Sequence, residues 1–556
     1  MEKVWLKNYP KGVPETIDPN EYESLGDMFI KSVNKYRDRP AYSNLGTVLS
    51  YDDIEKLTRD FAAYLSNHEG LKKGDRIAIM MPNLLQYPIV LFAALRAGLV
   101  VVNTNPLYTE RELEHQLNDS GAVGIVILEN FAETLTHILE KTQIKTIVTT
   151  RIGDLAPFPK SFLINFVVKH IKKMVPPFKL PTAVKFNDAL KIGQSESFDD
   201  VDVAHSDIAF LQYTGGTTGV AKGAALTHRN LIANLLQVKT WVSNELNAES
   251  KEIFITALPL YHIFSLTANA FAITLGAKSV LVTNPRDMKG FVKELDKENF
   301  TFMAGVNTLF NGLLNTPGFS DLDFSSVKLF LGGGMAVQES VAKEWKQVTG
   351  HTLIEAYGLT ETSPGVCVNP TNNQTFSGNI GLPLPSTDVC VKDINGKQGV
   401  FNEPGELCVR GPQVMQGYWN RPKETSNVMD ENGWLHTGDI AIIDEDGFVK
   451  LVDRLKDLII VSGFNVYPNE VENVVASHPK VLEVGAIGVP NKKSGETVKI
   501  FVVRKDKSLT EEELKAFCYE EMTRYKCPKY IQFVDELPKS NVGKVLRKDL
   551  RKLEQA

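Results

Sequence analysis

Short apolar runs alternate with helical patterns over most of the chain. From Asp75 onward, the runs RIAIMM, GLVVVNTN and AVGIVIL are separated by amphipathic stretches such as YTERELEHQLNDSG, and Gly, Pro or Asn marks each turn. The same alternation returns at EIFITALPL, KSVLVTN, TFMAGVN, VKLFLGGG and TLIEAYG. Repeated strand–helix units of this kind predict an α/β fold built on mostly parallel sheets.

The pattern changes near residue 380. Between 380 and 450 the apolar runs are short and separated by GLPLPSTD, DINGKQG and NEPGEL, which predicts a β-rich subdomain of antiparallel strands. After DRLKD the strands and helices mix again, and one helix opens with a capping box at Thr510 and Glu513. We therefore expect a large domain over 1–452, a hinge over 453–458 and a small, mobile α+β domain over 459–556.

Two apolar stretches raise the question of membrane spans. Residues 77–103 are interrupted by two prolines, two amides and Arg96, and residues 253–276 by Pro259, His262 and several hydroxyl or amide side chains. We predict a strand, a helix and a strand in the first stretch, and a buried strand, turn and helix in the second.

Composition narrows the class of protein. A chain of 556 residues is longer than one hydrophobic core usually supports, so two or more domains are expected. A net charge of −6 gives no reason to expect a nucleic acid partner. The five cysteines are scattered, odd in number and never spaced as CxxC, which disfavours a disulfide framework and a zinc site. The N-terminal residues lack the apolar core of a signal peptide, so a cytoplasmic location is expected.

One glycine- and threonine-rich stretch, YTGGTTGVAKG, begins at Tyr213. It is not a Walker A loop, because Lys222 follows Ala221 and precedes Gly223. Its residue types suit a phosphate group, since glycines free backbone N–H groups, threonines add hydroxyl donors and the lysine adds positive charge. Apolar IAFLQ precedes it and helix-like HRNLIANLLQV follows, so we expect an anion site between a strand and a helix. The alternative is a flexible surface loop.

The same stretch resembles the phosphate-binding signature of adenylate-forming enzymes, which include acyl-CoA synthetases, luciferases and peptide-synthetase adenylation domains. Six further segments follow in the order of that family: PLYHIF, GGGM, YGLTETSP, GWLHTGDI, DRLKDLIIVSGFNVYPNEVE and PKSNVGKVLR. Gly216 and Ala221 stand where many members have Ser and Pro. With NLLQYP, GVNTLFN and LDFSS, the chain most resembles the bacterial long-chain fatty acid–CoA ligases.

The resemblance implies a two-step reaction with ATP, Mg²⁺ and CoA. A carboxylate attacks the α-phosphorus of ATP to give an acyl-AMP, and the CoA thiol then opens that mixed anhydride. By resemblance, the catalytic residues are Lys544, Glu361, Thr360 and Thr214, and Glu361 and Thr214 are also the expected metal ligands. Lys544 suits charge neutralisation in the transition state. A solvated lysine and a capping carboxylate are the alternative interpretations of Lys544 and Glu361.

The resemblance also assigns binding residues. Tyr357 is expected against adenine, and Asp439 and Arg454 on the ribose hydroxyls. The expected ATP and CoA set is Thr214, Gly215, Gly216, Thr217, Thr218, Gly219, Lys222, Gly333, Gly334, Glu355, Ala356, Tyr357, Gly358, Thr360, Asp439, Arg454, Lys456, Gly463, Phe464 and Lys544. The expected acyl pocket is His262, Phe264, Gly305, Val306 and Gly332, where the glycines are expected to leave room for a chain. Taken alone, His262 is more typical of a buried core histidine than of a catalyst.

Moving the small domain is the expected solution to the second step. DRLKD resembles the family's hinge, with Lys456 the expected pivot and SGFN lining the CoA tunnel afterwards. No carrier domain follows Ala556, so CoA is the expected acceptor. The rivals are an aryl- or short-chain-CoA ligase, a luciferase, a ligase that serves a carrier protein, and a fatty-acid binding or uptake protein with a degenerate nucleotide site. The resemblance also allows a homodimer.

A basic and apolar segment lies outside these motifs. Residues 155–187 contain no Asp or Glu, and six lysines there are interleaved with Phe162, Phe166, Ile171 and other apolar side chains. This pattern is typical of an interfacial amphipathic segment, so we expect peripheral contact with the inner face of the membrane. A basic helix packed on the main domain fits the pattern equally well.

Overall fold

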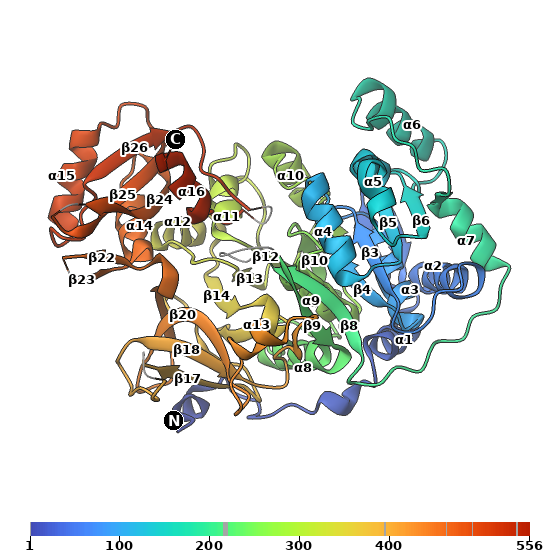
Figure 1. Cartoon of the computed structure of the whole chain (residues 1–556), viewed down its shortest axis with the longest axis horizontal. Helices are drawn as coiled ribbons and strands as arrows, with labels where there is room; N and C mark the ends of the chain where they lie inside the picture. The colour runs from blue at the N-terminus through green and yellow to red at the C-terminus, as the bar shows by residue number, and fades with distance from the viewer. Residues whose placement is uncertain are drawn as a thin grey trace.

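Two large mixed sheets, a smaller antiparallel sheet and a separate C-terminal sheet form the protein (Figure 1). The computed structural model describes residues 2–214, 221–393, 396–462, 464–491, 493–540 and 543–555. The fold is α/β with a large N-terminal part and a smaller C-terminal part, as the strand–helix alternation predicts.

The eight-stranded sheet has the order β19-β9-β8-β4-β3-β5-β6-β7. Its strands are β3 (Arg76–Met80), β4 (Val100–Asn103), β5 (Gly124–Leu128), β6 (Thr146–Thr150), β7 (Val184–Lys185), β8 (Ile208–Thr214), β9 (Lys222–Thr227) and β19 (Gly417–Tyr418). Alternate residues of β3 face opposite sides: Ile77 and Ile79 join the main core, whereas Ala78 and Met80 pack with the second cluster. The sheet is therefore covered on both faces.

The nine-stranded sheet has the order β16-β15-β14-β13-β12-β10-β11-β1-β2. Its strands are β1 (Pro40–Asn44), β2 (Thr47–Ser50), β10 (Ile253–Thr256), β11 (Lys278–Leu281), β12 (Phe302–Gly305), β13 (Leu329–Gly332), β14 (Leu353–Gly358), β15 (Gly365–Val368) and β16 (Leu382–Pro383). The strands from β1 through β11, β10, β12 and β13 to β14 are parallel, and antiparallel pairs close both edges.

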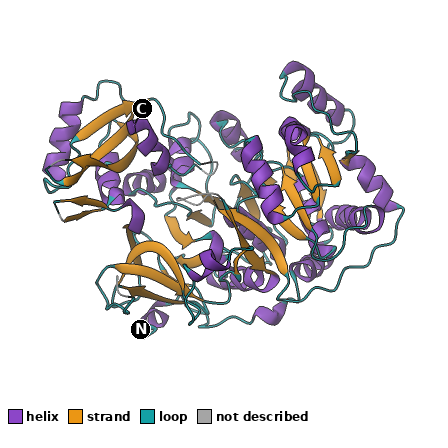
Figure 2. Cartoon of the chain, viewed as in Figure 1, coloured by secondary structure: helices purple, strands orange, loops and turns teal. Residues whose placement is uncertain are grey.

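Helices cover these sheets (Figure 2). They are α1 (Leu25–Tyr36), α2 (Tyr51–Ala63), α3 (Gln86–Arg96), α4 (Glu110–Ser120), α5 (Ala132–Ile138), α6 (Lys160–Phe166), α7 (Phe186–Gln194), α8 (His228–Trp241), α9 (Ile263–Thr274), α10 (Met288–Leu295), α11 (Asn307–Leu314), α12 (Glu339–Thr349) and α13 (Pro422–Ser426). One core cluster joins α1, α3, α8 and α9 to residues of both large sheets, while α4 and α5 pack on the other face of the eight-stranded sheet. The two sheets thus share a layer of helices.

The β-rich region is a four-stranded antiparallel sheet. Its order is β17 (Asp388–Lys392), β18 (Gly405–Arg410), β20 (Leu435–Ile443) and β21 (Val449–Arg454). A short helix, η8 (Leu455–Asp457), leads from β21 to a further sheet with hydrophobic clusters of its own. That sheet contains β22 (Ile459–Val461), β23 (Phe464–Val466), β24 (Val481–Asn491), β25 (Gly495–Arg504) and β26 (Tyr530–Val534), with α14 (Pro468–Ala476), α15 (Glu511–Glu521) and α16 (Arg547–Gln555).

Several local predictions are confirmed. Residues 77–103 form β3, α3 and β4, and residues 253–276 form β10, a turn and α9, with the α3 and α9 side chains mostly buried. The side chain of Thr510 caps α15 by accepting a hydrogen bond from the Glu513 backbone N–H at 3.2 Å, but the predicted capping box is only half formed, because the Glu513 carboxylate pairs with Lys480. In the described ranges no helix is long and apolar enough to cross a bilayer. All five cysteines are buried free thiols.

One prediction about the phosphate-like loop is wrong. The loop does not run from a strand into a helix, because β9 follows it and pairs antiparallel with β8 from Ile208↔Thr227 to Thr214↔Lys222. Helix α8 begins only afterwards, at His228, with Thr227 as its cap. The loop is therefore the tip of a hairpin. Gly215, Gly216, Thr217, Thr218 and Gly219 lie outside the described residues.

Candidate functional site

Thr214 and Lys222 face each other at the loop end of the β8–β9 hairpin. They form the last residue pair before the loop, so strand pairing fixes the backbone from which both half-buried side chains project. Tyr213, one residue earlier, donates its hydroxyl to Asp119 Oδ2 at 2.8 Å, and Arg421 pairs with the same carboxylate. These contacts attach the loop end of the hairpin to α4 and to the segment after β19.

Glu361 lies beside the loop end of the hairpin. It belongs to the short helix η7 (Thr360–Thr362), which follows β14 and contacts β9. Tyr418 donates its hydroxyl to Glu361 Oε1 at 2.7 Å, and the ring of the same tyrosine lies 5.2 Å from Lys222 Nζ. Sequence reasoning missed Tyr418, because its contacts come from segments far away along the chain.

Asp439 and Arg454 are neighbours, as expected for a shared role. They form a residue pair between β20 and β21, and Arg454 Nε lies 3.0 Å from Asp439 Oδ1. Tyr357 donates its hydroxyl to Asp439 Oδ2 at 2.6 Å. Burial and the Asp439 charge raise the pKa of Tyr357 well above its usual value, so the phenol stays a donor. The three side chains form one connected group, in which Tyr357 and Asp439 are buried and Arg454 is partly exposed.

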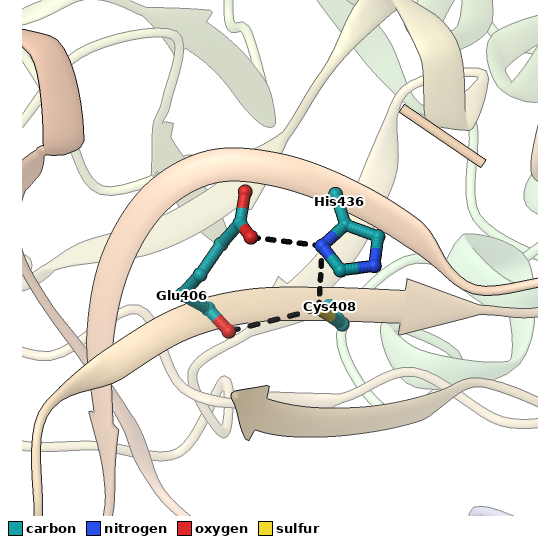
Figure 3. Close-up of side chains that lie close together, drawn as sticks. All are labelled: Glu406, Cys408 and His436. Atoms are coloured by element: carbon teal, nitrogen blue, oxygen red, sulfur yellow. Dashed lines mark hydrogen bonds and ion pairs between the residues drawn. The ribbon is translucent and has the colours of Figure 1, made fainter. Parts of the chain in front are cut away.

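A second set of contacts anchors the segment before Asp439 (Figure 3). Glu406 accepts the Gly438 backbone N–H at 3.1 Å and lies 2.8 Å from His436 Nδ1. Cys408 Sγ lies 3.6 Å from the same nitrogen. These donors are of metal-ligating types, but the Lys392 ammonium lies 3.4 Å from His436 Nε2 and takes up the other side of the ring. We interpret the cluster as an anchor for the part of β20 that carries Asp439.

Lys544 reaches this group from the C-terminal part of the chain. Burial, and next the Arg454 charge, lower the pKa of Lys544 to about 8, while Asp439 opposes that shift. Burial and the Lys544 charge lower the pKa of His262 to about 4, so this imidazole is neutral. Lys544 therefore lies within electrostatic reach of Asp439, Arg454 and His262.

The loop that holds Lys544 is tightly positioned. Ser540 donates its backbone N–H to the Lys544 carbonyl at 2.7 Å, and Lys544 donates its own N–H to Ser540 Oγ at 3.1 Å. Gly543 has a φ of +82°, and a Cβ there would lie 2.5 Å from Thr308 Oγ1. Thr308 donates to the Gly543 carbonyl at 3.0 Å and Asn311 to the Leu482 carbonyl at 2.9 Å. Helix α11 thus docks the C-terminal part.

Buried charges surround the predicted hinge. Arg547 lies 3.1 Å from Asp453, 3.5 Å from Asp457 and 2.9 Å from Glu472. Burial, and next the Arg454 charge, lower the pKa of Lys456. The guanidinium of Arg547 therefore joins β21 and η8 to α14 across the hinge.

The expected acyl-pocket residues lie around the ends of β12 and β13 and the start of α9. His262 caps α9, and Val306 lies 3.5 Å from the position of a Cβ on Gly334. The expectation that the glycines leave open room is wrong at two positions. A Cβ at Gly305 would meet Phe310 at 2.7 Å, and one at Gly332 would meet Val337 at 2.8 Å. The space that a side chain would occupy at these two glycines is filled by Phe310 and Val337.

Close packing also accounts for the lack of a side chain at residues 333 and 358. A Cβ at Gly333 would lie 3.1 Å from Phe264 and 3.2 Å from the Ala356 carbonyl. A Cβ at Gly358 would lie 1.9 Å from the Pro364 carbonyl, which no side chain tolerates. The backbone of β14 is therefore held close to both neighbours.

Glu355 departs from an ordinary surface carboxylate. Burial raises its pKa to about 8, and its Oε2 has no hydrogen-bond partner among the described residues. The Gly378 backbone N–H donates to this side chain. The side chain thus contacts the 370–379 loop, and any contact with a nucleotide from this position rests on the β14 backbone.

Phe464 is not part of the assembled group. Its side chain is 57% exposed and stacks on Tyr525 with ring centroids 5.0 Å apart. The β22–β23 hairpin lies at the outer edge of the C-terminal sheet (Figure 1). Gly463 lies outside the described residues. The Lys544 loop faces the large part while the hairpin faces solvent.

Comparisons with known proteins agree with this arrangement. The profile of the AMP-binding enzyme family matches residues 29–419, and that of the AMP-binding enzyme C-terminal domain matches residues 470–544. The chain is 57% identical over 552 residues to the long-chain-fatty-acid–CoA ligase of Escherichia coli O157:H7, covering 99% of this chain and 98% of the relative.

Solved structures share the fold. The anthranilate CoA ligase AuaEII in complex with anthranoyl-AMP matches with a TM-score of 0.86 at 23% identity, covering 97% of this chain and 99% of that one. ATP-bound MatB from Rhodopseudomonas palustris matches with a TM-score of 0.78 at 28% identity, covering 95% and 99%. The chain belongs to the AMP-binding enzyme family. Within that family its full-length likeness is to ligases that join long-chain fatty acids to CoA.

Proposed function

We propose that this protein is an ATP-dependent, AMP-forming ligase that converts long-chain fatty acids to acyl-CoA. The observation that carries the proposal is the group of Lys544, Asp439, Arg454 and Tyr357, which two parts of the chain assemble at one place. The full-length likeness to long-chain-fatty-acid–CoA ligases at 57% identity supports the substrate class.

In the first step a fatty carboxylate attacks the α-phosphorus of ATP, the bond to the β-phosphate breaks, and acyl-AMP and pyrophosphate form. Lys544 neutralises charge that develops between the two anions, and burial strengthens that interaction. Asp439 is the acceptor for the ribose hydroxyls, and Arg454 and Tyr357 fix the direction of its carboxylate. Thr214, Lys222 and Thr360 are the donors for the phosphates. Neutral His262 borders the acyl group.

Glu361 is the proposed ligand for Mg²⁺, with Thr214 beside it. The donor type fits, because Mg²⁺ prefers carboxylate and hydroxyl oxygens. One carboxylate oxygen is held by Tyr418, and among the described residues no hydrogen bond engages Oε2. A bound Mg²⁺ stabilises charge on the phosphate oxygens.

The second step requires the C-terminal part to turn. We take residues 1–452 as the large domain, 453–458 as the hinge and 459–556 as the small domain, with Lys456 as the pivot. The present orientation suits acyl-AMP formation, because Lys544 is half-buried beside Arg454 and Asp439 while Phe464 is exposed. Turning exchanges the Lys544 loop for the β22–β23 hairpin beside the CoA thiol.

The test is product formation by the purified protein with ATP, Mg²⁺ and carboxylates from acetate to oleate plus benzoates, each with and without CoA. We expect AMP and a CoA-dependent thioester whose rate rises with chain length. Accumulation of acyl-AMP without any effect of CoA would assign another acceptor. The absence of both products would favour a fatty-acid binding protein.

A second proposal concerns the membrane. Helix α6 and the following turn η6 (Val167–Ile171) contain no buried residue, and α6 projects from the body of the molecule (Figure 1). Phe158 is 87% exposed, and Phe162 and Ile171 are also exposed. Lysines flank these apolar side chains, so the segment suits the surface of an anionic bilayer. It allows the enzyme to take fatty acid from the inner leaflet.

Charge reversal tests the membrane proposal. Replacing Lys169, Lys172 and Lys173 with Glu is expected to weaken binding to anionic liposomes at low salt by at least ~100-fold, because each lysine near such a surface contributes about 1 kcal/mol. Flotation of the protein with liposomes measures the effect. The matched control replaces the exposed α10-region lysines 289, 293 and 297. Equal binding by both variants would remove the proposal.

A further inference from the structure

Tyr418 occupies a central place between two residues of the proposed nucleotide site. Its hydroxyl lies 2.7 Å from Glu361 Oε1, and its ring centroid lies 5.2 Å from Lys222 Nζ. The Glu361 carboxylate therefore accepts a hydrogen bond from the Tyr418 hydroxyl, and the Lys222 ammonium lies against the negative face of the Tyr418 ring.

The backbone around Tyr418 is fixed from several sides. Strand β19 adds to the edge of the eight-stranded sheet by pairing with β9, where Tyr418 stands opposite Ala224. Trp419 donates its N–H to the Gly223 carbonyl at 2.8 Å, and Tyr418 donates its N–H to Thr425 Oγ1 at 2.9 Å. Met415 donates its N–H to the Glu361 carbonyl at 2.8 Å. The tyrosine is thus held by the segments that carry both of its partners.

We propose that Tyr418 is a positioning residue, which aims the Glu361 carboxylate at the metal and keeps the Lys222 ammonium at the mouth of the phosphate loop. The hydroxyl engages Oε1 and so leaves Oε2 directed for a hard cation. The ring holds the ammonium by its face without neutralising it, so the full charge stays available to a phosphate. This inference rests on the proposed function of the site.

The first test separates the hydroxyl from the ring. Mn²⁺ serves as the probe, and its binding to the full-length protein with α,β-methylene ATP is measured by electron paramagnetic resonance. Tyr418→Phe is expected to weaken Mn²⁺ binding by ~10-fold, because partners of a ligating carboxylate set metal affinity to that extent. Tyr418→Leu is expected also to weaken metal-free ATP binding by about 2- to 5-fold, since the cation–π contact is lost.

Tyr64→Phe is the matched control. Tyr64 is buried and donates to the half-buried Glu69 at Oε1, 2.6 Å away, in a tyrosine–glutamate pair outside the proposed site. Unchanged Mn²⁺ binding by Tyr418→Phe, or an equal loss in Tyr64→Phe, would overturn the inference. In a Glu361→Gln background, Tyr418→Phe is expected to change Mn²⁺ affinity no further, and an additive loss would contradict positioning through Glu361.

Failure of the proposed function is a separate result. Wild-type protein that forms no acyl-AMP and no thioester contradicts the ligase proposal. Wild-type protein that forms both, with a Tyr418→Phe variant that binds Mn²⁺ normally, contradicts only the role of Tyr418.

Discussion

Replacing Lys544 with Ala is expected to lower the rate of acyl-AMP formation by ~10²- to 10³-fold, the effect of removing one preorganised charged donor from a transition state. The second step is expected to keep its rate, since under the proposed turn of the C-terminal part Lys544 leaves the site before CoA reacts. ATP–pyrophosphate exchange measures the first step, and thioester formation from synthetic acyl-AMP and CoA measures the second. An equal loss in both steps would contradict the assignment.

The charge of Lys544 also predicts the pH dependence. Its pKa is lowered to about 8, so the protonated fraction falls as the pH rises through that value. Exchange is therefore expected to decline above pH ~8, and Lys544→Arg to remove this decline, because a guanidinium stays charged. Lys539→Ala is the control on the same loop, where the lysine pairs with Glu483 at 2.6 Å.

Removal of Arg547 is the change with the largest expected effect on stability. Arg547→Ala leaves Asp453, Asp457 and Glu472 buried without their shared counterion. Breaking a buried ion pair in this way costs about 3–5 kcal/mol. All five tryptophans precede residue 453, so their fluorescence does not report on the C-terminal part. Hydrogen exchange of peptides from β24 and β25 measures the loss.

Arg551→Ala is the control for Arg547. Arg551 pairs with Asp457 at 2.8 Å but is 38% exposed, so its removal is expected to cost less than about 1 kcal/mol. If both variants exchange alike, the buried network does not stabilise the C-terminal part.

Much of the fold could be predicted because periodicity and turn residues agree locally. The strand, helix and strand from β3 to β4, and the Thr510 cap, follow from short-range pattern alone. Strand β9 could not be distinguished in this way, because its alanines and leucine also suit a helix that begins a few residues later. Only its pairing with β8 decides the matter, and that pairing depends on packing.

The site residues likewise divide into those that could be predicted from the sequence and those that depend on distant packing. The pairing of Asp439 with Arg454 was expected from the resemblance, and the structure supplies Tyr357 as their buried partner. Tyr418 was missed because it acts through a two-residue strand whose partner lies almost two hundred positions earlier, which no local pattern reports. The glycines of β12 and β13 were misinterpreted because a missing side chain means open space only where no neighbour fills it.

Strand β1 pairs with β11. The N-terminal residues before it reach two strands far along the chain: Lys3 pairs with Asp388 of β17 in the β-rich sheet at 2.9 Å, and Tyr9 donates to the carbonyl of Pro383 in β16 of the nine-stranded sheet at 2.6 Å. During synthesis these first segments therefore emerge long before their partners exist. Strand β1 can pair early with β2, but its other edge stays open until β11 has been made. The C-terminal sheet is continuous in sequence from β22 to α16 and is completed from neighbouring segments as soon as they are made.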